Sequence, residues 1–164
     1  MYKKIFFICF CCIFSNIVFG KKDNIQIDGK IEYSDIVEVG AVNIRKAESG
    51  TYMADIYAHN NQIMAGVQFE LLGKDFKILK VEGGRVGDGN FITHVGSDKG
   101  VILAFSMTGK MISAIDTLDY SKNKLFTLHF KKNIDKPSEF KMKALLAGKT
   151  GTKLSANFIP FLVD

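Results

Sequence analysis

A run of nine residues decides the fold of this chain: Met64-Ala65-Gly66-Val67-Gln68-Phe69-Glu70-Leu71-Leu72. Apolar side chains at positions 67, 69 and 71 alternate with Gly66, Gln68 and Glu70. Such a period of two is typical of a β-strand that buries one face and exposes the other. The run therefore predicts a strand with Gly66, Gln68 and Glu70 on its outward face.

The same alternation recurs along the chain. It is present in residues 52–59, 101–108, 125–130 and 140–146, and an apolar run closes the chain at 156–163. Clusters of Gly, Asn and Asp between these runs supply the residues that tight turns need. No segment has a capped apolar stripe of helical spacing over three turns. The pattern predicts an all-β chain folded as an antiparallel β-sandwich of about nine short strands.

The first twenty residues differ from the rest. Lys3 and Lys4 precede an unbroken apolar run, and Gly20 stands just before a plausible cleavage point, as in a secretory signal peptide. The apolar stretch 5–19 is short for a retained anchor, because a membrane span needs about 20 residues. The boundaries that we predict are 1–20 for a signal peptide, 21–40 for an N-terminal lead-in and 41–164 for the sandwich. We expect an extracellular or cell-surface protein that touches a membrane only if the signal segment is retained.

Loss of that segment changes the composition. All three cysteines lie within residues 1–20, so the rest of the chain can form no disulfide and no thiolate metal site. The formal charge of +5 falls to +3, because two lysines are lost. Residues 121–153 carry nine Lys against Asp135 and Glu139. These lysines alternate with apolar residues as on a solvated strand face, and secretion makes nucleic acid an unsuitable partner.

The sequence contains no pattern of a catalytic or metal site. His59 and His129 fall on outward strand positions, and the histidines stand at intervals of 35 residues, unlike zinc ligands. Asp55 and Glu70 are also expected at outward positions, where a solvated carboxylate is the default. The glycine-rich segment 83–90 lacks the endings of phosphate and calcium loops and predicts a turn. We therefore expect no enzyme activity, no cofactor and no metal.

Three segments together resemble the core of cohesin-like domains. The run 64–72, followed by residues 76–81, resembles their "Ala-Gly-hydrophobic-Gln-Phe-Asp-Leu … Leu-x-Val" pattern. The second segment resembles their Ala-Phe-Ser strand: Gly100-Val101-Ile102-Leu103-Ala104-Phe105-Ser106. The third resembles their Thr-Leu-x-Phe strand: Lys124-Leu125-Phe126-Thr127-Leu128-His129-Phe130-Lys131. Order and spacing match over about residues 40–164.

This resemblance implies a nine-stranded jelly-roll sandwich related to cellulose-binding modules. Cohesins bind dockerins, which are helical calcium-loaded modules, through a sheet face that includes the strand matching 64–72. The positions that match polar contact residues of that strand are Gly66 and Gln68. Gly66 offers no side chain, so the contact set departs from the usual one.

The first functional hypothesis is a secreted, non-catalytic module that binds a protein partner, dockerin-like or otherwise, on a flat sheet face. The candidate contact residues are the outward positions of 64–72 and 101–108: Gly66, Gln68, Glu70, Ile102, Ala104 and Ser106. Two alternatives stay open. Loops of the protein itself could cover this face. A carbohydrate-binding module of the same fold would bind polysaccharide, but the chain has no Trp and only Tyr57 is expected at an outward position.

Overall fold

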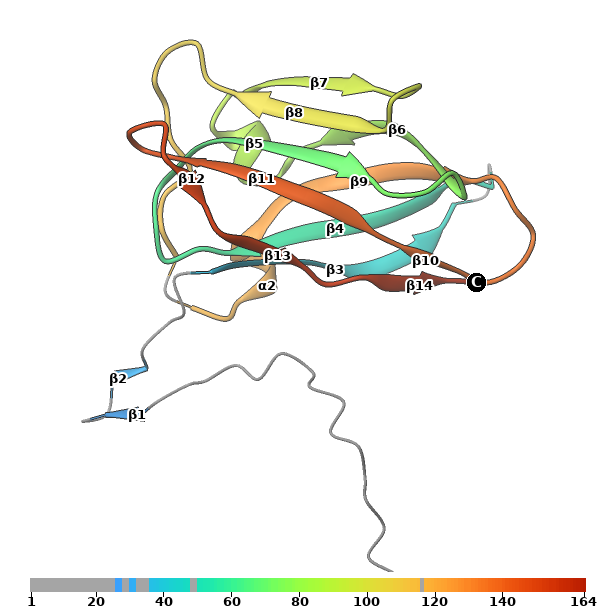
Figure 1. The fold of residues 1–164 in the computed structure, drawn as a ribbon, viewed down its shortest axis with the longest axis horizontal. Coiled ribbons are helices and arrows are strands. Elements are labelled where there is room, and N and C mark those ends of the chain that lie inside the picture. Colours follow the sequence, from blue (N-terminus) through green and yellow to red (C-terminus); the bar gives the residue numbers. More distant parts are fainter. Residues whose placement is uncertain (1–25, 28–29, 32–35, 48–49, 116) are drawn as a thin grey trace, which may run out of the picture. The chain divides into compact units, whose positions relative to one another are not determined.

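The computed structural model describes residues 26–27, 30–31, 36–47, 50–115 and 117–164 (Figure 1). The predicted signal peptide, residues 1–20, lies outside the described residues, as does most of the predicted lead-in. Within the described ranges, no helix has the length and apolarity that crossing a membrane requires.

Two five-stranded sheets form a sandwich, drawn in Figure 1 as two stacked layers. Sheet 1 is ordered β12 (Lys153–Leu154), β11 (Met142–Gly148), β5 (Met64–Leu71), β8 (Val101–Phe105) and β7 (Ile92–Gly96). Sheet 2 is ordered β13 (Ala156–Phe158), β3 (Val37–Lys46), β4 (Tyr52–His59), β9 (Lys124–Lys132) and β6 (Phe76–Glu82). Two short strands, β10 (Ser138–Phe140) and β14 (Phe161–Val163), form a separate antiparallel pair.

The predicted all-β sandwich is confirmed. The chain crosses repeatedly from one sheet to the other, since β4, β6 and β9 belong to sheet 2 while β5, β8 and β11 belong to sheet 1. Two details differ from the prediction. The sandwich has ten strands among the described residues, where about nine were expected. One pair, β13 with β3, is parallel, which is possible because most of the domain separates the two strands in sequence.

The hydrophobic core lies between the sheets. It is built from the inward positions of both, such as Val67 and Phe69 in sheet 1 and Ile56 and Leu128 in sheet 2. Phe69 and Phe126 meet across the core edge to face, with ring centroids 5.6 Å apart. Among the described residues, every member of the core lies between Val37 and Val163. The described core therefore belongs to the sandwich.

The start of the sandwich differs from the predicted boundary at residue 41. Strand β3 begins at Val37, and Val37 and Val39 are fully buried, at 1% and 0% exposure. The sequence already carried a signal for this strand, because Val37 and Val39 alternate with Glu38 and Gly40. Upstream, β1 (Gln26–Ile27) and β2 (Lys30–Ile31) form an antiparallel pair inside the expected lead-in. The available signal was the sequence between them, Asp28-Gly29, which is common in two-residue hairpin turns.

Two short helices interrupt the strands: α1 (Gly84–Asp88) and α2 (Tyr120–Asn123). The segment 83–90 was predicted to be a turn, but five of its residues form α1. Gly84 has φ +62°, and a Cβ there would lie 2.5 Å from the carbonyl oxygen of Leu125. The helix packs so closely on β9 because this position has no side chain.

Candidate functional site

The outer face of sheet 1 carries three rows of residues that run across its strands. The strand registers place the rows, from β11 or β12 to β7, in this order: Lys153, Ala147, Gly66, Phe105 and Ile92; then Leu145, Gln68, Leu103 and His94; then Lys143, Glu70, Val101 and Gly96. We call this set of residues the outer face. Its first two rows are mostly apolar, and its third row is mostly polar or small.

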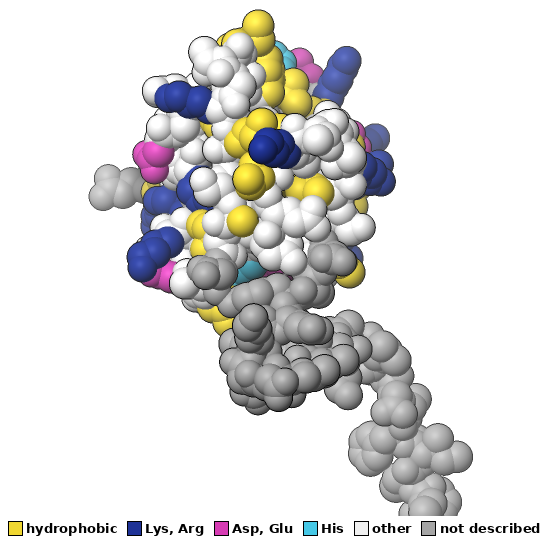
Figure 2. All heavy atoms as spheres, turned by 90° about the vertical axis from the view of Figure 1, so that its left-hand side faces the viewer, with side chains coloured by type: hydrophobic (Ala, Val, Ile, Leu, Met, Phe, Trp, Pro, Cys, Tyr) yellow, Lys and Arg dark blue, Asp and Glu magenta, His cyan; other side chains and the backbone are white. Residues whose placement is uncertain are grey.

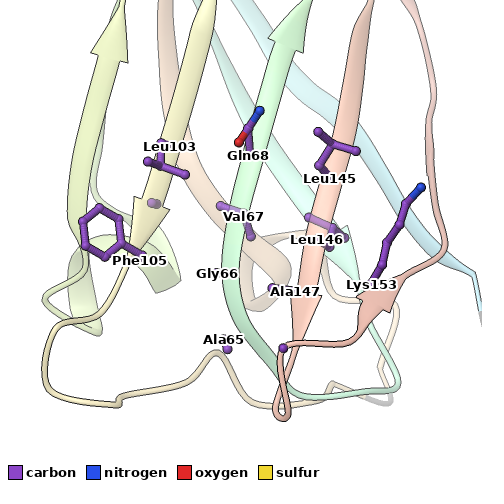
Figure 3. A pocket seen from close by; sticks show the side chains of 12 residues that line it. Ala65, Gly66, Val67, Gln68, Leu103, Phe105, Leu145, Leu146, Ala147 and Lys153 are labelled. Atoms are coloured by element: carbon purple, nitrogen blue, oxygen red, sulfur yellow. The ribbon is translucent and has the colours of Figure 1, made fainter.

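A hollow of about 460 Å³ lies over the first two rows of the outer face (Figure 3). Its floor is the bare backbone at Gly66, where an added Cβ would lie 3.3 Å from the carbonyl oxygen of Ala104. Leu103 and Phe105 flank the floor on one side of β5, and β11 and β12 flank it on the other (Figure 3). An exposed apolar depression of this kind is typical of a docking site for an apolar group.

The hollow has a polar border along β5. The side-chain amide of Gln68 donates a hydrogen bond to Glu70 Oε1 over 2.8 Å. Glu70 Oε2 lies 3.9 Å from Lys143 Nζ, so the carboxylate also forms an ion pair with β11. These contacts orient Gln68 at the edge of the apolar area. The outer face thus combines an apolar area with a polar border, as many protein interfaces do.

Two predicted contact residues are not on this face. Ile102 and Ala104 are 0% exposed and point into the core, because their register partners on β5 are the inward residues Phe69 and Val67. The prediction was wrong because β8 is apolar at every position from 101 to 105, so its periodicity could not identify the inward face. The outward residues of β8 are Val101, Leu103 and Phe105.

Ser106 lies just beyond the end of β8 and shapes a turn. Its Oγ accepts hydrogen bonds from the backbone N–H groups of Thr108 and Lys110, over 3.2 and 3.0 Å. It therefore stands beside the outer face and not in one of its rows. The other three predicted residues, Gly66, Gln68 and Glu70, do lie on the outer face and face away from the core.

The sequence analysis missed the contributions of β11 and β7. Leu145 lies opposite Gln68, and Ala147 lies opposite Gly66. The alternation in 140–146 already left Leu145 at an outward position, but only the register shows that it adjoins Gln68. Ile92, 48% exposed, extends the first row at the edge of the sheet. Figure 2 views the sandwich from one end, and hydrophobic side chains reach the surface at the top of that view.

The outer side of sheet 2 is different, because the chain itself covers part of it. Tyr57, predicted to face outward, is only 5% exposed. The rings of Tyr120 and His59 lie 4.8 and 4.9 Å from its ring. Burial raises the pKa of Tyr57 to about 12, and Glu38 and Tyr120 add to the effect. Tyr57 is therefore not free to stack on a sugar ring.

Asp55 was also expected in solvent, and it too is buried, at 8% exposure. Thr127 Oγ1 donates to its Oδ1 over 2.7 Å, and Asn43 Nδ2 donates to its Oδ2 over 3.1 Å. Lys124 Nζ and Arg45 Nη1 lie 3.9 and 3.7 Å from the carboxylate. Burial alone would raise the pKa of Asp55, but these hydrogen bonds and charges together hold it below its ordinary value.

The two histidines of sheet 2 are likewise largely buried and contact carboxylates, where surface positions had been expected. His59 Nδ1 lies 3.4 Å from Glu38 Oε1, and His129 Nε2 lies 2.7 Å from Glu82 Oε1. In the described part of the chain, no group of three or more His, Cys, Asp or Glu side chains is placed to hold a metal ion. On the outer side of sheet 2, four residues expected at outward positions are thus largely buried.

Comparison with models of protein families and with curated protein sequences finds no match. Solved structures do match. A type I cohesin in complex with a dockerin from Clostridium thermocellum is 18% identical, with a TM-score of 0.53, and the match covers 79% of this chain and 98% of that chain. A non-cellulosomal cohesin from Archaeoglobus fulgidus is 9% identical, with a TM-score of 0.54 and coverage of 77% and 88%.

A third match is the sixth cohesin of scaffoldin B from Acetivibrio cellulolyticus, in complex with a dockerin. It is 14% identical, with a TM-score of 0.51, and the match covers 79% of this chain and 98% of that chain. At these identities the similarity concerns the fold alone. It confirms the resemblance carried by residues 64–72, 100–106 and 124–131: this chain has the fold of a cohesin domain.

Proposed function

We propose that this chain is a non-catalytic binding module that docks a protein partner on the outer face of sheet 1. The observation that carries the proposal is the apolar hollow over Gly66 on the outer side of sheet 1. Large apolar side chains beside an open depression favour association, because their burial against a partner removes them from water.

The residues of the outer face indicate which chemical groups the partner would present to it. An apolar side chain of the partner would enter the hollow between Leu103 and Leu145, with the Gly66 backbone beneath it. Gln68 and Glu70 would meet polar groups at one border, and Lys153 would meet them at another. A dockerin or another secreted protein could present such a contact, and two of the similar structures are cohesins in complex with dockerins.

Two further parts of the proposal rest on the sequence. The signal-peptide pattern of residues 1–20 supports export to the cell exterior or surface. The proposed absence of catalysis rests on the lack of any catalytic motif in the sequence. The carbohydrate-binding alternative is weaker, because the one tyrosine expected to face outward, Tyr57, is buried under Tyr120 and His59.

A binding experiment tests the proposal. Residues 21–164, which include the whole described core, serve as immobilised bait for the secreted proteins of the source organism, with and without a calcium chelator. We expect one protein to be retained reproducibly, and loss in the chelator would identify a calcium-loaded partner such as a dockerin. Retention of the bait on polysaccharide, with no protein partner, would replace the proposal with the carbohydrate-binding function.

Two matched variants locate the contact. Leu103→Asp places a charge beside the hollow and should weaken binding at least about tenfold, since central apolar anchors dominate interface energies. Leu162→Asp makes the same change at a leucine that is 62% exposed on β14, and binding should stay within about twofold of wild type. Calorimetry measures both. If Leu103→Asp has an unchanged far-UV spectrum and binds as tightly as wild type, this face is excluded as the binding site.

A further inference from the structure

Strand β7 has a free edge. Among the described residues, it is the last strand of sheet 1 and has β8 as its one pairing partner. Its first three residues, Ile92, Thr93 and His94, are exposed. An edge strand of this kind offers unpaired backbone groups that another strand can bind.

The register shows which backbone groups point outward. The N–H of Leu71 donates to the carbonyl of Gly100 over 2.8 Å, so Gly100 directs its carbonyl toward β5. Successive residues of a strand direct their hydrogen-bonding groups to opposite sides. Leu103 therefore directs its groups toward β7, where His94 is its partner. Thr93 and Val95 flank His94 in the strand. They therefore direct their N–H and C=O groups to the free edge.

This edge lacks the features that normally prevent pairing. The edge strand β6 of sheet 2 carries Lys77, Lys80 and a bulge between Ile78 and Lys80. The other edge strands, β12 and β13, have only two and three residues. In contrast, β7 has five residues, no formal charge, no proline and no bulge, and its β-branched residues favour a strand.

We propose that β7 pairs with β7 of a second copy of this chain, antiparallel about a two-fold axis at His94. This register places Thr93 of each copy opposite Val95 of the other, so the outward N–H and C=O groups of both are satisfied. The strand has no formal charge, and its own copy therefore meets it without like-charge repulsion. A two-fold contact of this type closes on itself and yields a dimer.

Charges beyond the two ends of β7 also favour a second copy of this chain as the partner of the edge. If the antiparallel register is extended beyond the ends of β7, the turn at 97–100 of one copy comes beside the segment 88–91 of the other. We therefore expect Lys99 of one copy to approach Asp88 of the other. Both side chains are exposed, and neither forms an ion pair within the described part of one chain. The two-fold axis generates this contact twice. A second copy therefore offers complementary charge at both ends of the edge.

The dimer would continue sheet 1 into a ten-stranded sheet. Its two outer faces would then lie on the same side of that sheet, and both hollows would be open in the same direction. Because the pairing involves five residues from each copy, it is small compared with a standard interface, and the dimer should be weak. Its formation does not depend on the proposed partner function.

A charge-exchange experiment tests the pairing in residues 21–164 by sedimentation velocity over a range of concentrations. Wild type should show a concentration-dependent dimer. Asp88→Lys alone brings two ammonium groups together at each contact, and Lys99→Asp alone brings two carboxylates together, so each variant should weaken the dimer about tenfold or more. An equimolar mixture of the two variants should restore association, because each of the two contacts in a mixed dimer joins a lysine of one variant to an aspartate of the other. The mixture is compared with a chain that carries both substitutions.

The chain with both substitutions is the sharper test. Asp88→Lys combined with Lys99→Asp again places opposite charges at both contacts of its own dimer, so it should associate about as strongly as wild type. Each single variant should remain weaker than this double variant at every concentration. A double variant no stronger than the single variants would overturn the proposed register.

A backbone variant and a control complete the test. Thr93→Pro removes an N–H that points to the free edge and takes no part in the β8 ladder, so it should give a monomer with an unchanged far-UV spectrum. Lys153→Asp reverses a charge at the opposite edge of sheet 1 and should leave the dimer intact. A monomeric wild type, or a dimer that withstands Thr93→Pro, would overturn the proposal.

Discussion

Asp55 is the residue at which three strands of sheet 2 meet. Its carboxylate accepts hydrogen bonds from Asn43 on β3 and Thr127 on β9, while Asp55 itself lies on β4. Asn43 has φ +53°, which asparagine tolerates better than most side chains, and the register between β3 and β4 shifts at this point. The bulge therefore directs the Asn43 amide at the carboxylate. Asp55 is a structural acid whose charge is matched by its neighbours.

We expect Asp55→Asn to destabilise the protein by about 1–3 kcal/mol at pH 7, the usual cost of disrupting a buried hydrogen-bonded group. The new amide would direct N–H groups at donors that now contact a carboxylate oxygen. Urea unfolding measures the change. Asp135→Asn, at an exposed carboxylate, is the matched control and should have little effect. Equal stability of the two variants would show that the buried carboxylate of Asp55 does not stabilise the fold.

The lowered pKa of Asp55 makes its contribution to stability depend on pH. A group whose pKa is lower in the folded than in the unfolded state stabilises the fold above its unfolded pKa, which is near 4 for an aspartate. That contribution is lost as the pH falls from about 4 through the folded pKa. The difference in unfolding free energy between wild type and Asp55→Asn should therefore shrink below about pH 4.

At the scale of the element, α1 depends on one arginine. A helix of five residues is far too short to be stable alone. The guanidinium of Arg85 donates to Asn60 Oδ1 over 2.9 Å, to the carbonyl of Ala58 over 3.4 Å, and to the carbonyl of Ser113. Burial lowers the pKa of Arg85 to about 10, which leaves it charged at neutral pH. Arg85 thus ties α1 to the end of β4 and to the segment near residue 113.

Arg85→Met keeps the aliphatic length of the side chain but removes these hydrogen bonds. We expect faster amide hydrogen exchange in residues 84–91 and 111–115, by about tenfold or more, with little change in the core strands β5 and β9. Exchange followed by mass spectrometry measures both regions. Arg45→Met, at a more exposed arginine, is the control. A uniform increase along the chain would show global destabilisation instead of local release.

At the scale of the whole molecule, the sandwich holds its entire described core within residues 37–163. The chain also divides by its contacts into Met1–Glu32 and Tyr33–Asp164. We therefore expect a chain of residues 33–164 to unfold within about 2 °C of residues 21–164, because no described core contact is lost. Differential scanning calorimetry measures the two midpoints. A fall of more than about 5 °C would show that residues 21–32 contribute to the stability of the sandwich.

The sandwich and half of the site were predictable from local pattern. Residues 64–71 alternate cleanly, so Val67 and Phe69 could be assigned to the core and Gly66, Gln68 and Glu70 to the outer face. Residues 101–105 are apolar throughout, and the same rule then assigned Ile102 and Ala104 to the wrong side. Alternation identifies the buried face of a strand only where the other face is polar.

The amino-acid sequence by itself determined that this chain is a β-sandwich, which of its segments form most strands, and which face of β5 points outward. Only the tertiary structure decided that Leu103 and Leu145 flank Gly66, that Tyr57 and Asp55 are covered, and that β7 ends a sheet. The physical reason is that alternation is a property of one strand, whereas register, coverage and edges arise from contacts between segments distant in sequence. Burial of a side chain depends on what packs against it, and that is set by the assembled sheets.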